Sequence, residues 1–441
     1  MSNSRAARHR TGPIRATVAA LACCVAGALV LAAGPASAAP QPDFYTPPAQ
    51  LPAAAGAVVR TEPMPLFATV PAADGNWPTQ ARLVMYTSRL QDGTPTAVTG
   101  TFIDSAHPWQ GKGPRPTVVI APGTSGQGDQ CAMSRAFSTG MVADTDPLFL
   151  SANQEAPSAA VWSALGARVF VTDYIGLGTP GIHTYANRVE QAHAVLDAAR
   201  AAIALGDGGP ATPLALWGYS QGGGATAAAA ELAPSYAAEL NIKGTWAGGP
   251  TADLEQVLAQ IDGNLIGGAI GFAINGFVAR HPELEQTLHE RLTPEGAAVL
   301  DTLGTECIVN VIAQQPFLRT ATYTADHRSL LDNLRDVPEA MAILRAQRIG
   351  TLAPSRPVLV TSGRNDDTVP YGQARQLAVD WCDRGANVTF RTNELPPVAP
   401  GTTFVNHFGP ELIDGFGTDS AVRYLLDRFD DVPLAPGCSL T

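Results

Sequence analysis

The chain is poor in charge and nearly free of lysine. Charged residues make up 15% of its 441 residues, and only two of the 28 basic residues are lysines, Lys112 and Lys243. The formal net charge is −11 at pH 7. Nucleic acids and anionic membranes both attract clustered lysine and arginine, so this composition argues against either as a partner.

Motifs for metal and nucleotide sites are absent from the sequence. There is no His-Glu-x-x-His, no Cys-x-x-Cys and no phosphate-binding glycine loop, and the eight histidines show no paired ligand spacing. Gly176-Leu177-Gly178 is followed by Thr179-Pro180 instead of a helix start, which argues against a dinucleotide fingerprint. We therefore expect neither a metal nor a cofactor.

Long apolar runs are rare, and the one near the start predicts export. Residues 16–33 form an uncharged, mainly apolar run, and Pro35-Ala36-Ser37-Ala38 follows it. Four arginines precede the run, at positions 5, 8, 10 and 15. This layout is typical of a secretory signal peptide over residues 1–38, cleaved after Ala38 or Ala39, and it predicts an extracellular protein. A single transmembrane anchor is the alternative, which the Pro-, Ala- and Ser-rich exit disfavours.

Cysteine is also scarce, with six residues in the chain, and two of them lie in the predicted leader. The remaining four are an even set in an oxidising compartment, which favours two disulfides and leaves three pairings open. Buried free thiols are the alternative. The four are Cys131, Cys307, Cys382 and Cys438.

The apolar residues are arranged as short continuous strands alternating with helical stretches, such as 189–205 and 222–232. Continuous rather than alternating apolarity is typical of strands buried on both faces of a parallel sheet. The sequence thus predicts an α/β fold with a mostly parallel, doubly wound sheet. Ahead of it we expect an extended arm over 40–75 and a hairpin of 83–89 with 97–104. The five apolar strands are 117–121, 168–172, 214–217, 243–246 and 358–361, and a strand at 387–392 and a helix at 420–429 follow them.

The stretch from 251 to 350 has helical patterns and no strand run, which divides the core into residues 39–250 and 351–441. Within it, residues 264–279 carry no charge at all. We expect these residues to form either a buried helix of small residues or part of an apolar cap that lines a pocket for an apolar substrate.

One motif points to nucleophilic catalysis. Gly218-Tyr219-Ser220-Gln221-Gly222 is a G-x-S-x-G that follows an apolar strand and opens an Ala-rich helix. That context is the nucleophile elbow of α/β-hydrolases, which exposes the serine hydroxyl above the sheet. We expect Ser220 to be the nucleophile and the N–H of Gln221 to be one oxyanion donor.

Such a serine needs a base and an orienting acid, which follow it in the order Asp or Glu, then His. Asp366 and Asp367 come directly after the strand at 358–361, and both are candidates for the acid. Asp366 is favoured because it has the D-x-x-V-P spacing. Among the histidines only His407 lies beyond these aspartates, so it is the predicted base. Thr124, in the Gly-rich loop after the strand at 117–121, is the expected second oxyanion donor, with Ser125 as the alternative.

Several motifs along the chain occur together in one known family. They are Gly218 to Gly223, Asp173 to Gly178, Asn365 to Tyr371, Cys382 with Arg384 to Asn387, and His407. In this combination the sequence resembles the secretory lipases of the α/β-hydrolase superfamily, over about Thr61 to Cys438. The resemblance implies a helical cap after the sixth strand, an acyl-binding tunnel in that cap and activity on triacylglycerols. It supports the triad and implies the disulfides Cys131–Cys307 and Cys382–Cys438. A fungal member of this family has an acidic side chain in the oxyanion loop, where this chain has Gly123-Thr124-Ser125.

We therefore expect a secreted serine carboxylester hydrolase, most simply a triacylglycerol lipase. A peptidase or aminopeptidase on the same scaffold, an esterase limited to short chains, and a lipid-binding protein without catalysis are the alternatives. The expected partners are a small-molecule or lipid ester and, transiently, a lipid interface. We expect a monomer and no nucleic acid.

Overall fold

A computed structural model describes residues 42–66, 80–145 and 148–441 of the chain. The predicted signal peptide over 1–38 lies outside the described residues. Within them, none of the helices combines the length and the apolar character that a membrane span requires.

The core is a ten-stranded sheet with the strand order β1-β2-β3-β7-β4-β8-β9-β10-β11-β12. The strands from β7 to β12 run parallel, whereas β1, β2 and β3 form an antiparallel edge and β3 pairs antiparallel with β7. Strands such as β4 and β8 are buried at every position, as their continuous apolar sequences predict. The strands are β1 Val58–Met64, β2 Gln80–Arg89, β3 Pro95–Asp104, β4 Thr117–Ala121, β7 Arg168–Thr172, β8 Leu214–Tyr219, β9 Ile242–Gly248, β10 Val358–Gly363, β11 Val388–Asn393 and β12 Cys438–Leu440.

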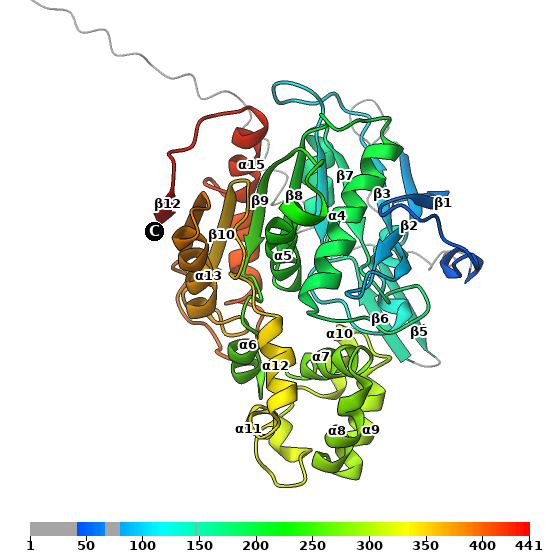
Figure 1. Cartoon of the computed structure of the whole chain (residues 1–441), viewed down its shortest axis with the longest axis vertical. Coiled ribbons are helices and arrows are strands. Elements are labelled where there is room, and N and C mark those ends of the chain that lie inside the picture. Colours follow the sequence, from blue (N-terminus) through cyan, green and yellow to red (C-terminus); the bar gives the residue numbers. More distant parts are fainter. Residues whose placement is uncertain (1–41, 67–79, 146–147) are drawn as a thin grey trace, which may run out of the picture.

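Helices cover both faces of the sheet, so the α/β prediction is confirmed. One apolar cluster joins the sheet to α4 (Arg188–Leu205), α5 (Gln221–Tyr236) and α13 (Tyr371–Asp383), which lie together in front of the sheet in Figure 1. A second cluster joins the other face to α3 (Ala156–Ala164) and α15 (Ala421–Phe429). The many alanines of α4 and α5 let these two helices pack closely against each other and against the sheet.

Several elements differ from the sequence-based prediction. Of the extended arm predicted over 40–75, the structure describes residues 42–66, and these form a short 3-10 helix, Pro42–Tyr45, and the edge strand β1. Phe44 and Tyr45 are buried in the second cluster, which explains why this segment is ordered on the body. The cap consequently follows β9, the seventh strand of the main sheet, and not the sixth. The hairpin of β5 (Met141–Thr145) with β6 (Leu148–Ala152) and the edge strand β12 were not anticipated.

Between β9 and β10 the chain forms only helices, gathered beyond one end of the sheet at the bottom of Figure 1. Polar side chains cap the N-termini of two of these helices. The Asp253 side chain accepts from the N–H groups of Glu255 and Gln256 at the start of α6, and the Thr293 side chain accepts from the N–H of Gly296 at the start of α9. The charge-free segment contains α7, where Phe272 is fully buried. The cap helices are α6 Leu254–Ile261, α7 Ala269–Val278, α8 Glu285–Arg291, α9 Pro294–Leu303, α10 Ile308–Gln314, α11 Leu330–Arg335 and α12 Pro338–Ala346.

Candidate active site

The turn between β8 and α5 holds Ser220 in a strained conformation. Ser220 has φ 59° and ψ −120°, a region that non-glycine residues rarely adopt. The flanking glycines make the turn possible, because a Cβ on Gly218 would collide with the carbonyl of Gly222, and one on Gly222 with that of Ala121. This close packing sets the hydroxyl of Ser220 at the end of the sheet, beside the loop that follows β4.

The structure brings the three predicted triad residues together. Ser220 Oγ lies 2.8 Å from His407 Nε2, and His407 Nδ1 lies 2.8 Å and 3.0 Å from the two carboxylate oxygens of Asp366. All three residues are buried, with His407 only 1% exposed. Asp366 Oδ1 also accepts from the N–H groups of Thr368 and Val369 at 2.9 and 2.8 Å, which fixes the carboxylate plane. This is the geometry in which an imidazole can take the serine proton while a carboxylate holds its tautomer.

The neighbouring Asp367 is turned away from the imidazole. Its Oδ2 accepts from the N–H groups of Gly401 and Thr403 at 2.7 and 3.1 Å, and its carbonyl accepts from Asn264 Nδ2 at 2.8 Å. Asp367 therefore holds the turn that leads to His407 and links it to the cap. Of the two adjacent aspartates, Asp366 alone is within hydrogen-bond distance of the base among the described contacts.

Gln221 begins α5, where its backbone N–H has no acceptor within the helix and can face an anion. Its side chain is anchored, since Nε2 lies 3.0 Å from His183 Nε2 and 3.1 Å from Gln191 Oε1. Burial lowers the pKa of His183 to about 4, so the ring is neutral. Its Nδ1 donates to the carbonyl of Ile175 at 2.9 Å, which leaves Nε2 to accept from Gln221. This role of His183 could not be predicted from the sequence, because His183 and Gln221 are 38 positions apart in the chain.

The loop after β4 is held from two sides. The N–H of Gly123 donates to Glu155 Oε1 at 3.0 Å, and Tyr174 Oη donates to the carbonyl of Pro122 at 2.8 Å. Because Gly123 uses its N–H in this way, that N–H is not available to an oxyanion, and Thr124 stays the predicted second donor. Tyr174 belongs to the Asp173 to Gly178 motif, which sequence reasoning noted without a role. Its backbone φ of 68° turns it towards the loop.

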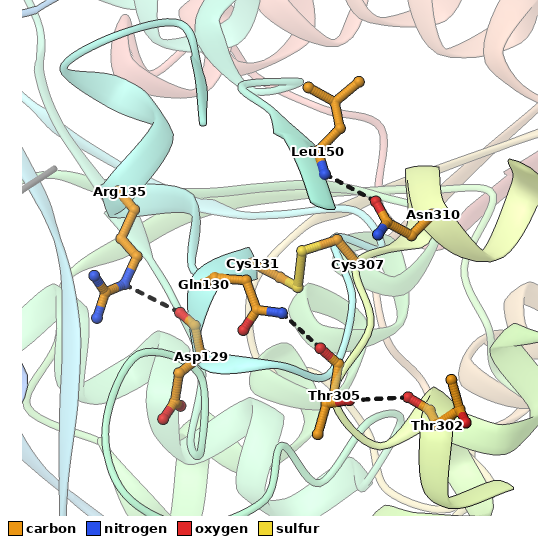
Figure 2. Close-up of a disulfide and its surroundings, with 9 residues drawn as sticks. All are labelled: Asp129, Gln130, Cys131, Arg135, Leu150, Thr302, Thr305, Cys307 and Asn310. Atoms are coloured by element: carbon orange, nitrogen blue, oxygen red, sulfur yellow. Dashed lines mark hydrogen bonds between the residues drawn. A yellow bond between two sulfur atoms is a disulfide. The ribbon is translucent and has the colours of Figure 1, made fainter. Parts of the chain in front are cut away.

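The structure contains both disulfides that the resemblance implies, Cys131–Cys307 and Cys382–Cys438. Figure 2 shows the first, which joins the segment after the oxyanion loop to the start of α10. Backbone and side-chain contacts join the same two segments: Gln130 Nε2 donates to the carbonyl of Thr305 at 2.6 Å, and the N–H of Ile308 donates to the carbonyl of Ser125 at 2.9 Å. The hairpin strand β6 is also attached to α10, since the N–H of Leu150 donates to Asn310 Oδ1 at 2.8 Å. The cap and the oxyanion loop are thus fastened together.

Removing this disulfide by the double change Cys131→Ser and Cys307→Ser should therefore reduce both stability and kcat. The closed loop spans 176 residues, for which chain entropy gives about 5 kcal/mol as an upper figure. The loosened loop should cost up to about 100-fold in kcat, the scale of one lost oxyanion donor. Thermal unfolding and initial ester rates measure the two effects. The pair Cys382→Ser and Cys438→Ser is the control, which should lose stability alone; an unchanged kcat in the first variant would refute the link.

Two glutamates near the site influence each other's ionisation: Glu155 is buried and Glu411 is half-buried. Burial raises the pKa of Glu155 to about 7; burial and the nearby charge of Glu155 raise that of Glu411, in α14 (Phe408–Phe416), to about 8. Both values lie above the ordinary 4.5, so the folded chain holds protons that the unfolded chain releases. The stabilisation is complete below pH 4.5 and is lost as the pH rises towards 8.

Glu411→Gln should accordingly raise the unfolding free energy at pH 8 by roughly 1–2 kcal/mol and leave it unchanged near pH 4. The variant keeps the shape of the neutral acid and cannot ionise. Urea unfolding at both pH values measures the difference. The exposed Glu285→Gln is a control with no pH-dependent effect. An equal increase in the unfolding free energy at both pH values, or a decrease at pH 8, would contradict the raised pKa of Glu411.

An apolar pocket lies within the cap. Its wall is mainly aliphatic and comes from α6, α7, α8, α11 and α12, with Ile270, Ile274, Leu258, Leu288, Leu334 and Leu344 among the lining residues. The charge-free segment over 264–279 was expected to be either a buried helix or part of a cap that lines a pocket. Its helix α7 is both, since it packs into the cap and lines the pocket. Tyr185 is part of the wall, and its hydroxyl lies 2.8 Å from Thr124 Oγ1. Tyr185 thus connects the wall of the pocket to the loop that follows β4. Among the described residues no group of His, Cys, Asp and Glu is placed to hold a metal ion.

A doubly wound sheet whose elbow serine is hydrogen-bonded to a histidine, which is in turn hydrogen-bonded to an aspartate, defines a serine hydrolase of the α/β-hydrolase fold. Residues 156–437, more than half of the chain, match the family model described as secretory lipase. The chain belongs to the secretory lipase family, which confirms the resemblance seen in the sequence.

Individual relatives cover most of the chain. The probable inactive lipase MT1628 of Mycobacterium tuberculosis is 26% identical over 401 residues, 89% of this chain and 82% of the relative. The secreted triacylglycerol lipase LIP5 of Malassezia globosa is 25% identical over 368 residues, 81% of this chain and 71% of the relative. Candida antarctica lipase A in its closed state has the same fold, with a TM-score of 0.74 at 24% identity, covering 92% of this chain and 91% of that one.

Proposed function

We propose that the protein is a secreted carboxylester hydrolase that cleaves acylglycerols through an acyl-enzyme. The observation that carries the proposal is the continuous chain of hydrogen bonds from Ser220 Oγ through His407 to Asp366. A serine at its own pKa is a weak nucleophile, and this arrangement is what activates it.

In the proposed reaction His407 Nε2 takes the proton of Ser220 as Oγ attacks the ester carbonyl carbon. Asp366 stabilises the imidazolium that forms. The carbonyl oxygen becomes an oxyanion, which the N–H groups of Gln221 and Thr124 stabilise. When the tetrahedral intermediate collapses, His407 gives its proton to the departing alcohol and leaves an ester on Ser220. Water then attacks that ester by the same route and releases the fatty acid.

The pocket supports an acyl chain as the part of the substrate that is bound. Its wall has no carboxylate among the lining residues, which disfavours the aminopeptidase alternative because nothing there would hold a substrate amine. Its apolar surface matches a fatty acyl group. A longer chain would bury more apolar surface, so we expect the enzyme to accept medium or long acyl esters.

The surface beside His407 supports contact with a neutral lipid interface. Phe404 is 59% exposed, and Leu412 and Ile413 on α14 are 56% and 51% exposed. No lysine or arginine occurs from residue 392 to residue 422, so this surface favours uncharged acylglycerol over an anionic bilayer. The signal-peptide pattern and the two disulfides support secretion of the enzyme.

A relative named as inactive makes lipid binding without catalysis the rival function. Assays of the purified mature protein on p-nitrophenyl butyrate, p-nitrophenyl palmitate, emulsified triolein and an aminoacyl anilide separate the possibilities. We expect turnover of the three esters and none of the anilide. Anilide turnover would favour a peptidase, butyrate turnover alone a short-chain esterase, and no turnover at all a binding protein.

A further inference from the structure

Tyr185 joins the wall of the apolar pocket to the oxyanion loop. Its ring lines the pocket and packs edge-on against Phe272 of α7 and against His183, with centroids 5.8 and 6.0 Å apart. Both neighbours are buried, with Phe272 at 0% and His183 at 1% exposure. α7 lies directly on this segment, since a Cβ on Gly276 would be 3.0 Å from the backbone N of Tyr185. The ring position is therefore set by the cap and not by Thr124.

The hydroxyl of Tyr185 and that of Thr124 lie 2.8 Å apart, and either could donate. A phenol is a stronger donor than an aliphatic alcohol, so the pair is best arranged with Tyr185 donating to Thr124 Oγ1. Burial raises the pKa of Tyr185, which keeps the phenol protonated across the working pH range. In this arrangement the proton on Thr124 Oγ1 is left to donate to another acceptor.

An acceptor arises at this place only during the reaction. β4 pairs with β8 so that Ala121 is opposite Gly218, and Gly222 packs against the carbonyls of Ala121 and Pro122. The loop that carries Thr124 therefore starts beside the elbow of Ser220. A carbonyl oxygen that gains negative charge at Ser220 would therefore lie beside this loop.

We propose that the Thr124 hydroxyl is a third oxyanion donor and that Tyr185 is the positioning residue that orients it. The inference rests on the proposed ester hydrolysis and extends it to a residue that no motif marks. A donor that already accepts a hydrogen bond is polarised and donates more strongly. Because the oxyanion exists only in the tetrahedral state, losing Tyr185 Oη should lower kcat and leave KM unchanged. The ring that lines the pocket remains in Tyr185→Phe.

A double-mutant cycle with Tyr185→Phe and Thr124→Val tests this coupling. We expect Tyr185→Phe to lower kcat on p-nitrophenyl butyrate by about 10-fold, and Thr124→Val to lower it by about 100-fold. In the Thr124→Val background, Tyr185→Phe should have no further effect, because the hydroxyl it orients is gone. The affinity of a butylboronic acid, which forms a tetrahedral adduct on serine, should fall in parallel with kcat.

Two controls separate orientation from damage to the fold. Thr124→Ser keeps the hydroxyl and should retain kcat within about threefold of the native enzyme. Tyr371→Phe removes another tyrosine hydroxyl paired with a threonine, Thr392 at 2.9 Å, and should leave kcat unchanged. A native kcat in Tyr185→Phe, a loss confined to KM, or the same 10-fold loss in the Thr124→Val background would overturn the assignment. If the native enzyme hydrolyses no ester and binds no boronic acid, the proposed function itself fails, and this inference fails with it.

Discussion

Replacing Ser220 with alanine should lower kcat for ester hydrolysis by about 10⁵- to 10⁶-fold, down to the rate supported by the oxyanion donors and substrate binding alone. The expectation follows from the 2.8 Å contact with His407 Nε2, because without Oγ there is no nucleophile and no acyl-enzyme. His407→Ala should have an effect of similar size. Initial rates at saturating p-nitrophenyl butyrate measure the loss.

The fold should survive the change, since alanine at this position removes one hydroxyl and keeps the Cβ. Equal melting temperatures of the two proteins would establish this. Ser235→Ala, an exposed serine at the far end of the same helix α5, should retain native activity. Retention of near-native kcat in Ser220→Ala would show that another residue attacks the ester.

The second large effect is expected at Asp366. Asp366→Asn should lower kcat by about 10⁴-fold, because an amide in place of the carboxylate selects the wrong tautomer of His407 and leaves its charged form unstabilised. Asp367→Asn should cost far less, since Asp367 holds the turn at Gly401 and Thr403 and does not bond the imidazole. Measuring kcat for the two variants side by side compares two isosteric changes at adjacent positions. A greater loss of kcat in Asp367→Asn than in Asp366→Asn would show that Asp367, and not Asp366, is the acid of the triad.

The catalytic core could be predicted because its signals are local. Strands such as β4 and β10 are buried on both faces, so their sequences are continuous apolar runs that are visible without the fold. The turn at Ser220 requires glycine at positions 218 and 222, where a Cβ would collide with a backbone carbonyl. The G-x-S-x-G motif is therefore visible in the sequence. Chain order in α/β-hydrolases then indicated His407, the one histidine beyond the two aspartates.

The supporting residues could not be predicted, because each acts across a contact between distant segments. Tyr185 meets Thr124 across 61 positions, and Glu155 meets Gly123 across 32. A single tyrosine or glutamate belongs to no repeating pattern in the sequence, so its partner in a distant segment cannot be predicted from it. The edge strand β12 could not be predicted for the same reason. It has only three residues, all exposed, and it pairs with β11 next to the disulfide that Cys438 forms with Cys382.

The choice between the two adjacent aspartates also required the fold. Both follow β10 immediately, and sequence spacing alone favours Asp366 without excluding its neighbour. The hydrogen bonds resolve which carboxylate faces the imidazole, because Asp366 is fixed by the N–H groups of Thr368 and Val369 while Asp367 turns to the 401–403 segment.

The most direct test of the covalent mechanism is intact-protein mass spectrometry after treatment with a p-nitrophenyl alkylphosphonate. Attack by Ser220 Oγ on phosphorus would expel p-nitrophenolate and leave a stable tetrahedral phosphonate ester on the serine. We expect one phosphonyl group per native chain, mapped to the peptide with Ser220, a matching burst of one equivalent of p-nitrophenolate and loss of esterase activity. We expect no labelling of Ser220→Ala. Labelling at another residue, or an unlabelled native enzyme that still turns over esters, would contradict the covalent role of Ser220.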